Sequence, residues 1–240
     1  MKTKTLLIAT LTMVFATPFA GCSDDDDDDV VSSKLTLNED AIILTHNDTT
    51  ALSVSGNEVV EWSTTDQFIA TVDEDGVVTG HHVGATIVEA KTADGRTAEC
   101  GVAVVPMYFT FKEPYIEWGK SQADVLAGQD FAKDCTQDGT EVSSSQSSGK
   151  MYSARYRIDP GKGLYYSEVQ IKGEYELEIY KFLEERYQYL DTRDGVRYYV
   201  DSYSAETYET MIGCFRTKHY SKTYIVITYM SGDYLRSESK

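Results

Sequence analysis

Basic residues are scarce in this sequence. Its 240 residues include 22 Lys and Arg against 39 Asp and Glu, which gives a formal net charge of −17. A nucleic-acid-binding domain carries a basic patch or stripe, and none is evident here, so we expect no nucleic-acid partner. The acidity is uneven, because residues 1–106 hold 5 basic and 18 acidic side chains, whereas residues 107–240 hold 17 and 21.

Catalytic motifs are lacking as well. The chain contains no Gly-x-Ser-x-Gly elbow, no His-Glu-x-x-His and no phosphate-binding loop. The part after residue 106 has a single histidine, His219, which we interpret as a surface residue at a strand end. Glu184, Glu185 and Arg186 lie on the polar side of a predicted helix, where such residues are normally solvated or paired. We therefore predict no catalytic residue, no cofactor and no enzyme activity.

Metal ligands are not grouped in any convincing pattern. His81 and His82 are adjacent in a predicted strand region and should point to opposite faces, so they cannot easily chelate one ion. The run Asp73-Glu74-Asp75-Gly76 looks loosely like a calcium loop but lacks the full spacing and the terminal glutamate, and a hairpin turn explains it better. The cysteine spacings match no zinc pattern, so we predict no metal site.

The N-terminus has the features of an export signal. Lys2 and Lys4 precede an apolar stretch from Leu6 to about Ala20, which is short for a membrane span. The sequence Phe19-Ala20-Gly21-Cys22 resembles the lipobox of bacterial lipoproteins, with Phe19 in place of the usual leucine. The resemblance implies cleavage after residue 21 and lipid attachment to Cys22, which anchors the protein in a membrane. An ordinary secretory signal with a chance cysteine is the alternative.

An acidic segment follows the cysteine. Ser23 and Asp24–Asp29 read as a solvated, self-repelling tether over residues 22–33. The same run resembles the surface-export signal of Bacteroidetes lipoproteins. That resemblance implies a protein that is lipid-anchored in the outer membrane and exposed on the cell surface. The residues alone leave open whether the anchor faces outward or toward the periplasm.

Three cysteines remain once Cys22 carries lipid. An odd number in an oxidising compartment means at least one free thiol or an intermolecular bond. Cys100 lies in an apolar run and is expected to be a buried small hydrophobe. We therefore consider Cys135 and Cys214 the candidate disulfide pair.

Tyrosine marks a boundary within the chain. All 18 tyrosines lie at or after Tyr108, and the change in composition falls near Pro106. Such a difference predicts two domains, one over residues 34–106 and one over residues 107–240.

The first domain reads as short strands separated by turn signals. Asp75-Gly76 and Asp94-Gly95 are hairpin-type dipeptides. Strands are predicted over residues 34–38, 41–44, 50–54, 59–63, 69–72, 77–79, 84–91 and 97–105. Seven or so short strands within about 70 residues predict an all-β sandwich.

The order of motifs in this domain points to a known family. Glu61-Trp62-Ser63-Thr64, Ile69-Ala70-Thr71-Val72, Gly76-Val77-Val78-Thr79-Gly80 and Gly84-Ala85-Thr86-Ile87 strongly resemble the bacterial immunoglobulin-like domain, group 2 (Big2). The resemblance implies that Trp62 lies in or beside the core. We expect Gly76, Gly80 and Gly84 to serve turns that need unusual backbone angles. Members occur in adhesins and as spacers in surface enzymes, so an extracellular module is implied and not a chemistry.

The second domain is predicted to be α+β, with an antiparallel sheet and about two helices on one face. Ser121 is a plausible N-cap for a first helix that ends at Phe131, and apolar residues at helical spacing predict a second helix over residues 174–190. Residues 136–149 form either a long loop or two strand ends with a loop. Strands are expected over residues 108–116, 151–158, 164–172, 196–202, 210–219 and 223–230.

Tyrosine pairs occur within the predicted strands. In Tyr165-Tyr166 and Tyr198-Tyr199, one member of each pair should face away from the core. Half-buried sheets are commonly rich in tyrosine, which explains most of them. A face with several exposed rings can also form a recognition surface, because aromatic rings bind sugars and proteins well.

These features together predict a cell-surface binding or adhesion module. The Ig-like domain would act as spacer and the Tyr-rich domain as recognition head for a glycan or protein, through residues that the sequence does not specify. A non-catalytic accessory subunit of an envelope complex is the alternative. A hydrolase whose site the sequence conceals is the third reading.

Overall fold

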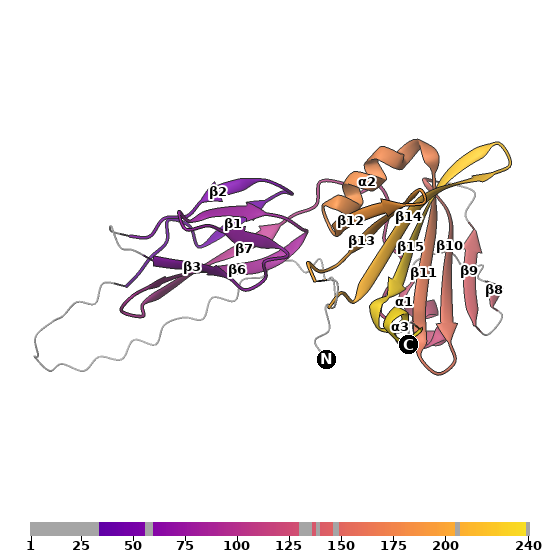
Figure 1. The fold of residues 1–240 in the computed structure, drawn as a ribbon, viewed down its shortest axis with the longest axis horizontal. Coiled ribbons are helices and arrows are strands. Elements are labelled where there is room, and N and C mark those ends of the chain that lie inside the picture. Colours follow the sequence, from indigo (N-terminus) through magenta and orange to yellow (C-terminus); the bar gives the residue numbers. More distant parts are fainter. Residues whose placement is uncertain are drawn as a thin grey trace, which may run out of the picture. The chain divides into compact units, whose positions relative to one another are not determined.

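The computed structural model describes residues 34–240 except residues 56–59, 130–135, 138–139, 146–148, 205–206 and 239–240 (Figure 1). The predicted signal peptide (residues 1–21), Cys22 and the acidic tether (residues 22–33) lie outside the described residues. No helix among the described residues is long and apolar enough to cross a membrane.

Two small sheets form the N-terminal sandwich. One has the strand order β1-β7-β6-β3 and the other β2-β5-β4, and β1 runs parallel to β7 while the other pairs are antiparallel. The predicted strand over residues 34–38 is reduced to an isolated bridge between Leu37 and Val54. The strands are β1 Ala41–Leu44, β2 Thr49–Ala51, β3 Val60–Thr64, β4 Ala70–Val72, β5 Val77–Gly80, β6 Gly84–Thr92 and β7 Thr97–Val104.

The core of the sandwich lies between these sheets. Val78, Val88 and Cys100 are fully buried in it, and Trp62 packs against it, as predicted. Gly76 has φ +79°, and a Cβ there would lie 2.6 Å from the Leu52 carbonyl oxygen, so the turn requires glycine. The expectation was wrong for Gly80 and Gly84, which do not have positive φ. Gly84 is needed for space, since a Cβ there would lie 2.7 Å from Ile69 Cδ1.

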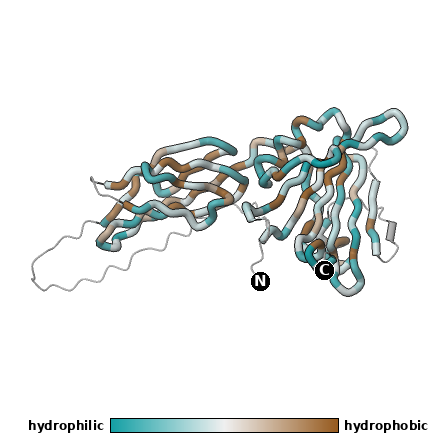
Figure 2. Tube along the Cα trace, viewed as in Figure 1, coloured by the Kyte–Doolittle hydropathy of each residue, from teal (hydrophilic) through white to brown (hydrophobic). Residues whose placement is uncertain are grey.

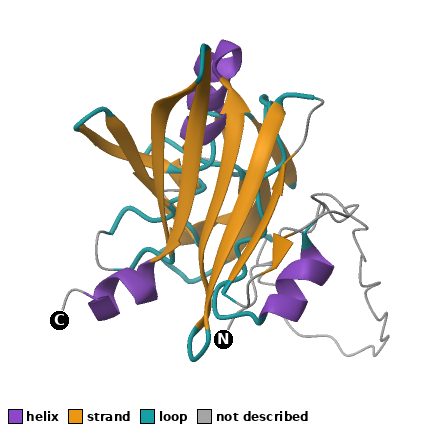
Figure 3. Ribbon diagram, turned by 90° about the vertical axis from the view of Figure 1, so that its right-hand side faces the viewer, coloured by secondary structure: helices purple, strands orange, loops and turns teal. Residues whose placement is uncertain are grey.

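An eight-stranded sheet follows, with the order β12-β13-β14-β15-β11-β10-β9-β8 (Figure 1). Figure 3 shows its long strands from another side, in orange. Every neighbouring pair is antiparallel, as predicted. Residues 136–149 were expected to form either a long loop or two strand ends with a loop, and the structure has strands there, β8 and β9. The strands are β8 Thr136–Gln137, β9 Glu141–Ser145, β10 Met151–Asp159, β11 Gly163–Lys172, β12 Gln188–Arg193, β13 Val196–Val200, β14 Thr210–His219 and β15 Lys222–Ser231.

Three α-helices and one 3₁₀ turn accompany this sheet in the described part of the chain: α1 Gln122–Gly128, η1 Gly173–Tyr175, α2 Glu176–Glu184 and α3 Gly232–Glu238. Ser121 caps α1 as predicted, and its side chain exchanges hydrogen bonds with Asp124 in a capping box. The third helix, α3, was not predicted.

The segment 107–118 was predicted to contain a strand, and this prediction was wrong. It runs without strand pairing and packs against the core formed by the sheet, α1 and α2. The hydroxyl of Ser167 in β11 donates to the Tyr115 carbonyl at 2.7 Å, and Trp118 Nε1 donates to Thr210 Oγ1 at 3.0 Å. The apolar residues that suggested a strand therefore cover the sheet and do not extend it.

The helix predicted over residues 174–190 ends at Glu184. Residues 188–193 instead pair with β13, joined by a hairpin at Asp194-Gly195, where φ is +50° and +80°. Two-residue hairpins favour such angles, and the ladder they start outweighs the helical spacing of Tyr187 and Leu190. Tyr187 is still in the core, whereas Leu190 is 42% exposed.

Residues 34–240 form one compact unit in the structure. The division at residue 106 is therefore not confirmed and stays a prediction. Figure 2 shows apolar positions recurring along the strands of both the sandwich and the eight-stranded sheet. Each has its own cluster of buried apolar side chains.

Candidate functional site

A row of polar side chains on α2 faces two arginines of the sheet. Glu176, Tyr180 and Glu184 are spaced four residues apart, so they share one side of the helix. Arg197 of β13 lies opposite Cys214 of β14, and Arg216 follows two positions later. Both arginines therefore point to the face on which Cys214 joins the core beneath α2.

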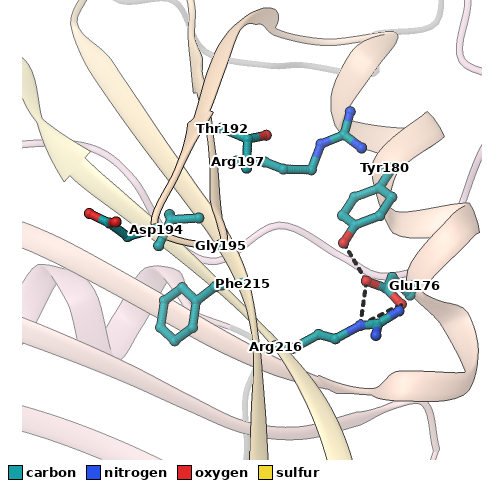
Figure 4. Close-up of a pocket in the computed structure, with 9 residues that line it drawn as sticks. Glu176, Tyr180, Thr192, Asp194, Gly195, Arg197, Phe215 and Arg216 are labelled. Atoms are coloured by element: carbon teal, nitrogen blue, oxygen red, sulfur yellow. Dashed lines mark hydrogen bonds and ion pairs between the residues drawn. The ribbon is translucent and has the colours of Figure 1, made fainter.

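The two arginines are held by carboxylates of the helix, and Figure 4 shows the pair of Arg216 with Glu176. Arg216 Nε donates to both oxygens of Glu176, at 2.8 and 2.9 Å, and its Nη2 donates to one of them as well. The Tyr180 hydroxyl donates to the same carboxylate. Arg197 Nη2 donates to Glu184 Oε1 at 2.7 Å. Each guanidinium is thus fixed in orientation.

Tyrosine rings surround the Arg197 guanidinium. Its central carbon lies 4.2 Å from the centroid of the Tyr180 ring, 5.0 Å from that of Tyr189 and 5.8 Å from that of Tyr199. Cation–π contacts of this kind stabilise a partly desolvated arginine, because its charge faces the negative side of the rings. Only 27% of the Arg197 side chain is exposed, whereas 68% of the Arg216 side chain is.

These groups line a hollow of about 600 Å³ beside the β12–β13 hairpin. Phe215 and Val196 contribute apolar surface to the hollow, and the strand register places both on the opposite face of the sheet from Arg197 and Arg216. Figure 4 shows Phe215 pointing away from Arg216. The hollow thus opens at the sheet edge and continues onto that opposite face. Its lining consists of Glu176, Tyr180, Thr192, Asp194, Gly195, Val196, Arg197, Phe215 and Arg216.

We call this opposite side of the sheet the far face. Its side chains alternate with those of the core, and none of them belongs to the core cluster. One row of side chains crosses five neighbouring strands on this face, beginning with an aromatic residue and ending with two charged ones: Tyr198, Gly213, Thr228, Glu168 and Arg155.

Glu168 in this row is 7% exposed and accepts hydrogen bonds from Tyr166 Oη at 2.5 Å and Gln170 Nε2 at 3.0 Å. The Arg157 guanidinium lies 4.9 Å from the Tyr166 ring centroid. The far face therefore presents a preformed mixture of rings, amide and charge.

The protonation states of the hollow are set by its contacts. The hydrogen bond from Arg216 lowers the pKa of the Glu176 carboxyl, and the hydrogen bond to Glu176 raises the pKa of Arg216. Burial, together with the hydrogen bond to Glu176, raises the pKa of the Tyr180 phenol above its usual value. These groups keep one protonation state around neutral pH, which suits fixed hydrogen bonding and not proton transfer.

The other acidic and histidine candidates have structural surroundings. Glu184 pairs with Arg197, and Glu185 is 1% exposed and pairs with Arg186. Both glutamates are thus paired, which is one of the two states expected from the sequence, but Glu185 is buried and does not lie on a solvated helix side. His219 is exposed at the end of β14, as predicted, with its ring 4.6 Å from that of Tyr220.

The tyrosine pairs divide differently. Tyr199 is fully buried in the core and Tyr198 lies on the far face, as predicted. Tyr165 and Tyr166 are both half-buried, and neither belongs to the core cluster. Tyr165 stacks on Tyr234 of α3, with ring centroids 4.1 Å apart.

The metal candidates of the sandwich are engaged elsewhere. His82 Nδ1 lies 2.7 Å from the Phe68 carbonyl oxygen, and His81 Nε2 lies 2.8 Å from Thr71 Oγ1. Asp73 Oδ1 accepts the N–H groups of Asp75 and Val77, so the acidic run forms the predicted turn. No group of three or more metal-ligating side chains is found in the part of the chain that the structure describes.

Two of the three remaining cysteines are among the described residues, one in each core. Cys100 is fully buried, as predicted, and Cys214 is a buried free thiol in the structure. Burial raises the pKa of the Cys214 thiol to about 12. Cys135 lies outside the described residues, so its pairing with Cys214 stays a prediction.

The residues that form the hollow were not identified from the sequence. The spacing of Glu176, Tyr180 and Glu184 was a usable signal for a polar helix side. The partners Arg197 and Arg216 depend on the register of β13 against β14, which no local pattern gives.

The fold defines a class: an Ig-like sandwich followed by an antiparallel sheet that carries a polar and aromatic hollow. The family comparison agrees for the sandwich. Residues 29–102 match the model of the Bacterial Ig-like domain (group 2) family. This match confirms the resemblance that the motifs around Trp62 and Gly76 indicated.

Individual relatives match parts of the chain. An alpha-L-arabinofuranosidase from Bifidobacterium longum subsp. longum is 42% identical over 101 residues, which cover 41% of this chain and 9% of that protein. The crystal structure of an intimin–Tir90 complex matches 35% of this chain and 53% of that chain, at 22% identity and a TM-score of 0.28. Surface layer protein SbsC, domains 4–9, matches 83% of this chain and 27% of that one, at 13% identity and a TM-score of 0.26. The chain thus spans less than two thirds of the length of each.

Proposed function

We propose that this protein is a cell-surface lipoprotein that acts as a binding or adhesion module. Cys22 carries the lipid, the Ig-like sandwich is the spacer, and the eight-stranded sheet with its hollow is the recognition head. The ligand is a glycan or a protein bound at the hollow and the adjoining far face.

The hollow carries this proposal. Ligand sites are concave, mix apolar walls with a few fixed polar groups, and have volumes of about 300–1,000 Å³. The hollow of about 600 Å³ combines Phe215 and Tyr180 with the guanidinium groups of Arg197 and Arg216. Because both arginines are oriented by carboxylates before any ligand arrives, little side-chain entropy is lost on binding.

The protonation pattern favours binding over catalysis. General acid–base work needs a group that titrates near the working pH. In the hollow, hydrogen bonding lowers the pKa of Glu176 and burial raises the pKa of Tyr180, so both move away from neutrality. The match to the Ig-like family supports the spacer role, since such domains occur in adhesins and surface enzymes.

A binding panel tests the head. The compact unit Lys34–Lys240 is applied to arrays of glycans, mucins and matrix proteins. We expect specific binding that falls at least about tenfold in Arg197→Met. The matched control is Arg193→Met, because Arg193 lies in the same hairpin, is 72% exposed and does not line the hollow. Thr192→Lys blocks the hollow from an exposed position and separates loss of binding from loss of folding.

Two outcomes would overturn the head role: absence of binding across the whole panel, or binding that both hollow variants leave unchanged. Protease treatment of intact cells tests the location separately. Cleavage in intact cells is expected for a surface-exposed protein, and protection in intact but not in lysed cells contradicts it.

A further inference from the structure

Part of the outer side of the larger sandwich sheet, over β1, β7 and the start of β6, is apolar. Along β6 and β7, Val88, Cys100 and Val102 point into the core, so their alternate neighbours point outward. At the end of the sheet nearer Ala85 and Ala103, these neighbours and those of β1 are apolar, although the solvated side of an antiparallel sheet is normally polar; Glu89, Lys91, Thr97 and Glu99 occupy the other end. We call this set the apolar face, which comprises Ala41, Ile43, Ala85, Ile87, Gly101, Ala103 and Val105.

The strand register makes the apolar face continuous. Ala41 lies beside Gly101, which lies beside Ile87, and the next outward row is Ile43, Ala103 and Ala85. Neighbouring strands lie about 4.8 Å apart, so these side chains touch the same surface. Ile43 is 72% exposed, Ile87 41% and Val105 37%. Contiguous exposed apolar residues mark an interaction site, whereas single ones are ordinary.

The sizes of the side chains on the apolar face would allow a partner to pack closely against it. Gly101 and Ala103 on the middle strand lie between the larger Ile43 and Ile87 on its neighbours. Because Gly101 and Ala103 have small side chains or none, a partner can approach the β7 backbone closely there.

Carboxylates border the apolar face. Glu89 and Glu99 lie directly opposite each other in the next outward row, and like charges in this position destabilise a sheet. Glu39 and Asp48 line a second hollow, of about 380 Å³, beside Ile43. Residues 34–106 as a whole carry 12 acidic and 3 basic side chains. Cations from a partner would relieve this repulsion.

We propose that the apolar face docks a protein partner whose contact surface has an apolar centre flanked by lysine or arginine. Charge selects this occupant. A second copy of the chain would bring the same carboxylates against each other, and an anionic bilayer would repel them. The proposal concerns the sandwich and does not depend on ligand binding by the eight-stranded sheet.

Site-specific photo-crosslinking in cells that produce the protein would identify the partner. A photoreactive amino acid replaces Ile87 in the full chain, and a second chain carries it at Leu177, a 68% exposed residue of α2. The expected result is an adduct at Ile87 and not at Leu177, whose protein component is then identified and purified. Absence of any Ile87 adduct, or adducts with a second copy alone, overturns the proposal.

Affinity measurements with the purified partner complete the test. Ile43→Glu should weaken binding at least about tenfold, because it places a charge in the centre of the contact. Leu177→Glu, matched in exposure and chemistry, should leave binding unchanged. Glu99→Lys should weaken binding and flatten its dependence on salt. Equal affinity for the Ile43 and Leu177 variants, or binding indifferent to salt and to Glu99→Lys, overturns the proposal even if an adduct forms.

Discussion

Replacement of Glu185 by alanine is expected to destabilise the eight-stranded sheet severely. This carboxylate is 1% exposed, belongs to the C-cap residue that follows α2, and pairs with Arg186, whose side chain is 13% exposed. It also accepts the backbone N–H groups of Met107 and Tyr108, at 2.8 and 3.1 Å. It therefore fixes the start of the 107–118 segment to the end of the helix.

The magnitude follows from what alanine leaves behind. Removing one partner of a buried ion pair costs about 3–5 kcal/mol, because the other charge stays buried. The N–H groups of Met107 and Tyr108 also lose their acceptor, but Met107 is 56% exposed and water can replace the carboxylate there, so this adds less than ~1 kcal/mol. We expect a total loss of about 4 kcal/mol for Glu185→Ala. Glu185→Gln keeps one acceptor oxygen and should lose about 2 kcal/mol.

Urea unfolding measures these losses. Trp118 packs against the core of the sheet and reports on it in a Trp62→Phe background shared by all variants. The matched control is Glu184→Ala. Glu184 is the adjacent glutamate, pairs with Arg197 and has a side chain that is 40% exposed. That change should cost under about 1 kcal/mol. If the two alanine variants unfold within about 1 kcal/mol of each other, the assignment of Glu185 as the fixing group is refuted.

Three further predictions concern the two cores. Burial lowers the pKa of His82 from 6.5 to about 4. The stability that neutral His82 contributes is therefore complete above pH 6.5 and is lost as the pH falls from there through 4, by about 3 kcal/mol. Urea unfolding at pH 7.5 and pH 4 should show this loss, and the loss should be smaller in His82→Asn. Gly76→Ala should cost more than Gly95→Ala, since both have positive φ but only Gly76 lacks room for a Cβ; thermal unfolding should give ~1 kcal/mol for Gly95 and well above 2 for Gly76, and equal losses would contradict the steric reason. The Cys214 thiol, whose pKa burial raises to about 12, should resist iodoacetamide at pH 8 in the folded protein and react after unfolding under reducing conditions, as mass spectrometry of its peptide would show. Labelling in the folded state would contradict its burial.

Local patterns predicted the strands of the long hairpins well. β10, β11, β14 and β15 lie within one or two residues of the predicted bounds, because each combines alternation with a clear turn. At the Asp159-Pro160-Gly161 turn, Asp159 Oδ1 accepts the N–H groups of Gly161 and Lys162, which is the local chemistry that makes such turns readable.

The failures depend on long-range contacts. Residues 108–116 have the composition of a strand, but their partners are side chains such as Tyr187, whose hydroxyl donates to Glu113 at 2.7 Å. The end of α2 was missed because residues after Glu184 pair with β13. The hollow was missed for the same reason: Arg197 and Arg216 meet α2 only after the register of the sheet is set.

The parallel pairing of β1 with β7 has a mechanical consequence. The chain enters the sandwich ahead of β1 and leaves it after β7, and these strands are neighbours in register from Ala41–Gly101 to Leu44–Val104. A pull between the two ends of the sandwich acts on the two strands in opposite directions along their axes. The hydrogen bonds between them are then loaded together in shear and cannot open one at a time. A sandwich whose end strands are paired in this way resists a pull along the chain with all of these hydrogen bonds at once, and not with one bond after another.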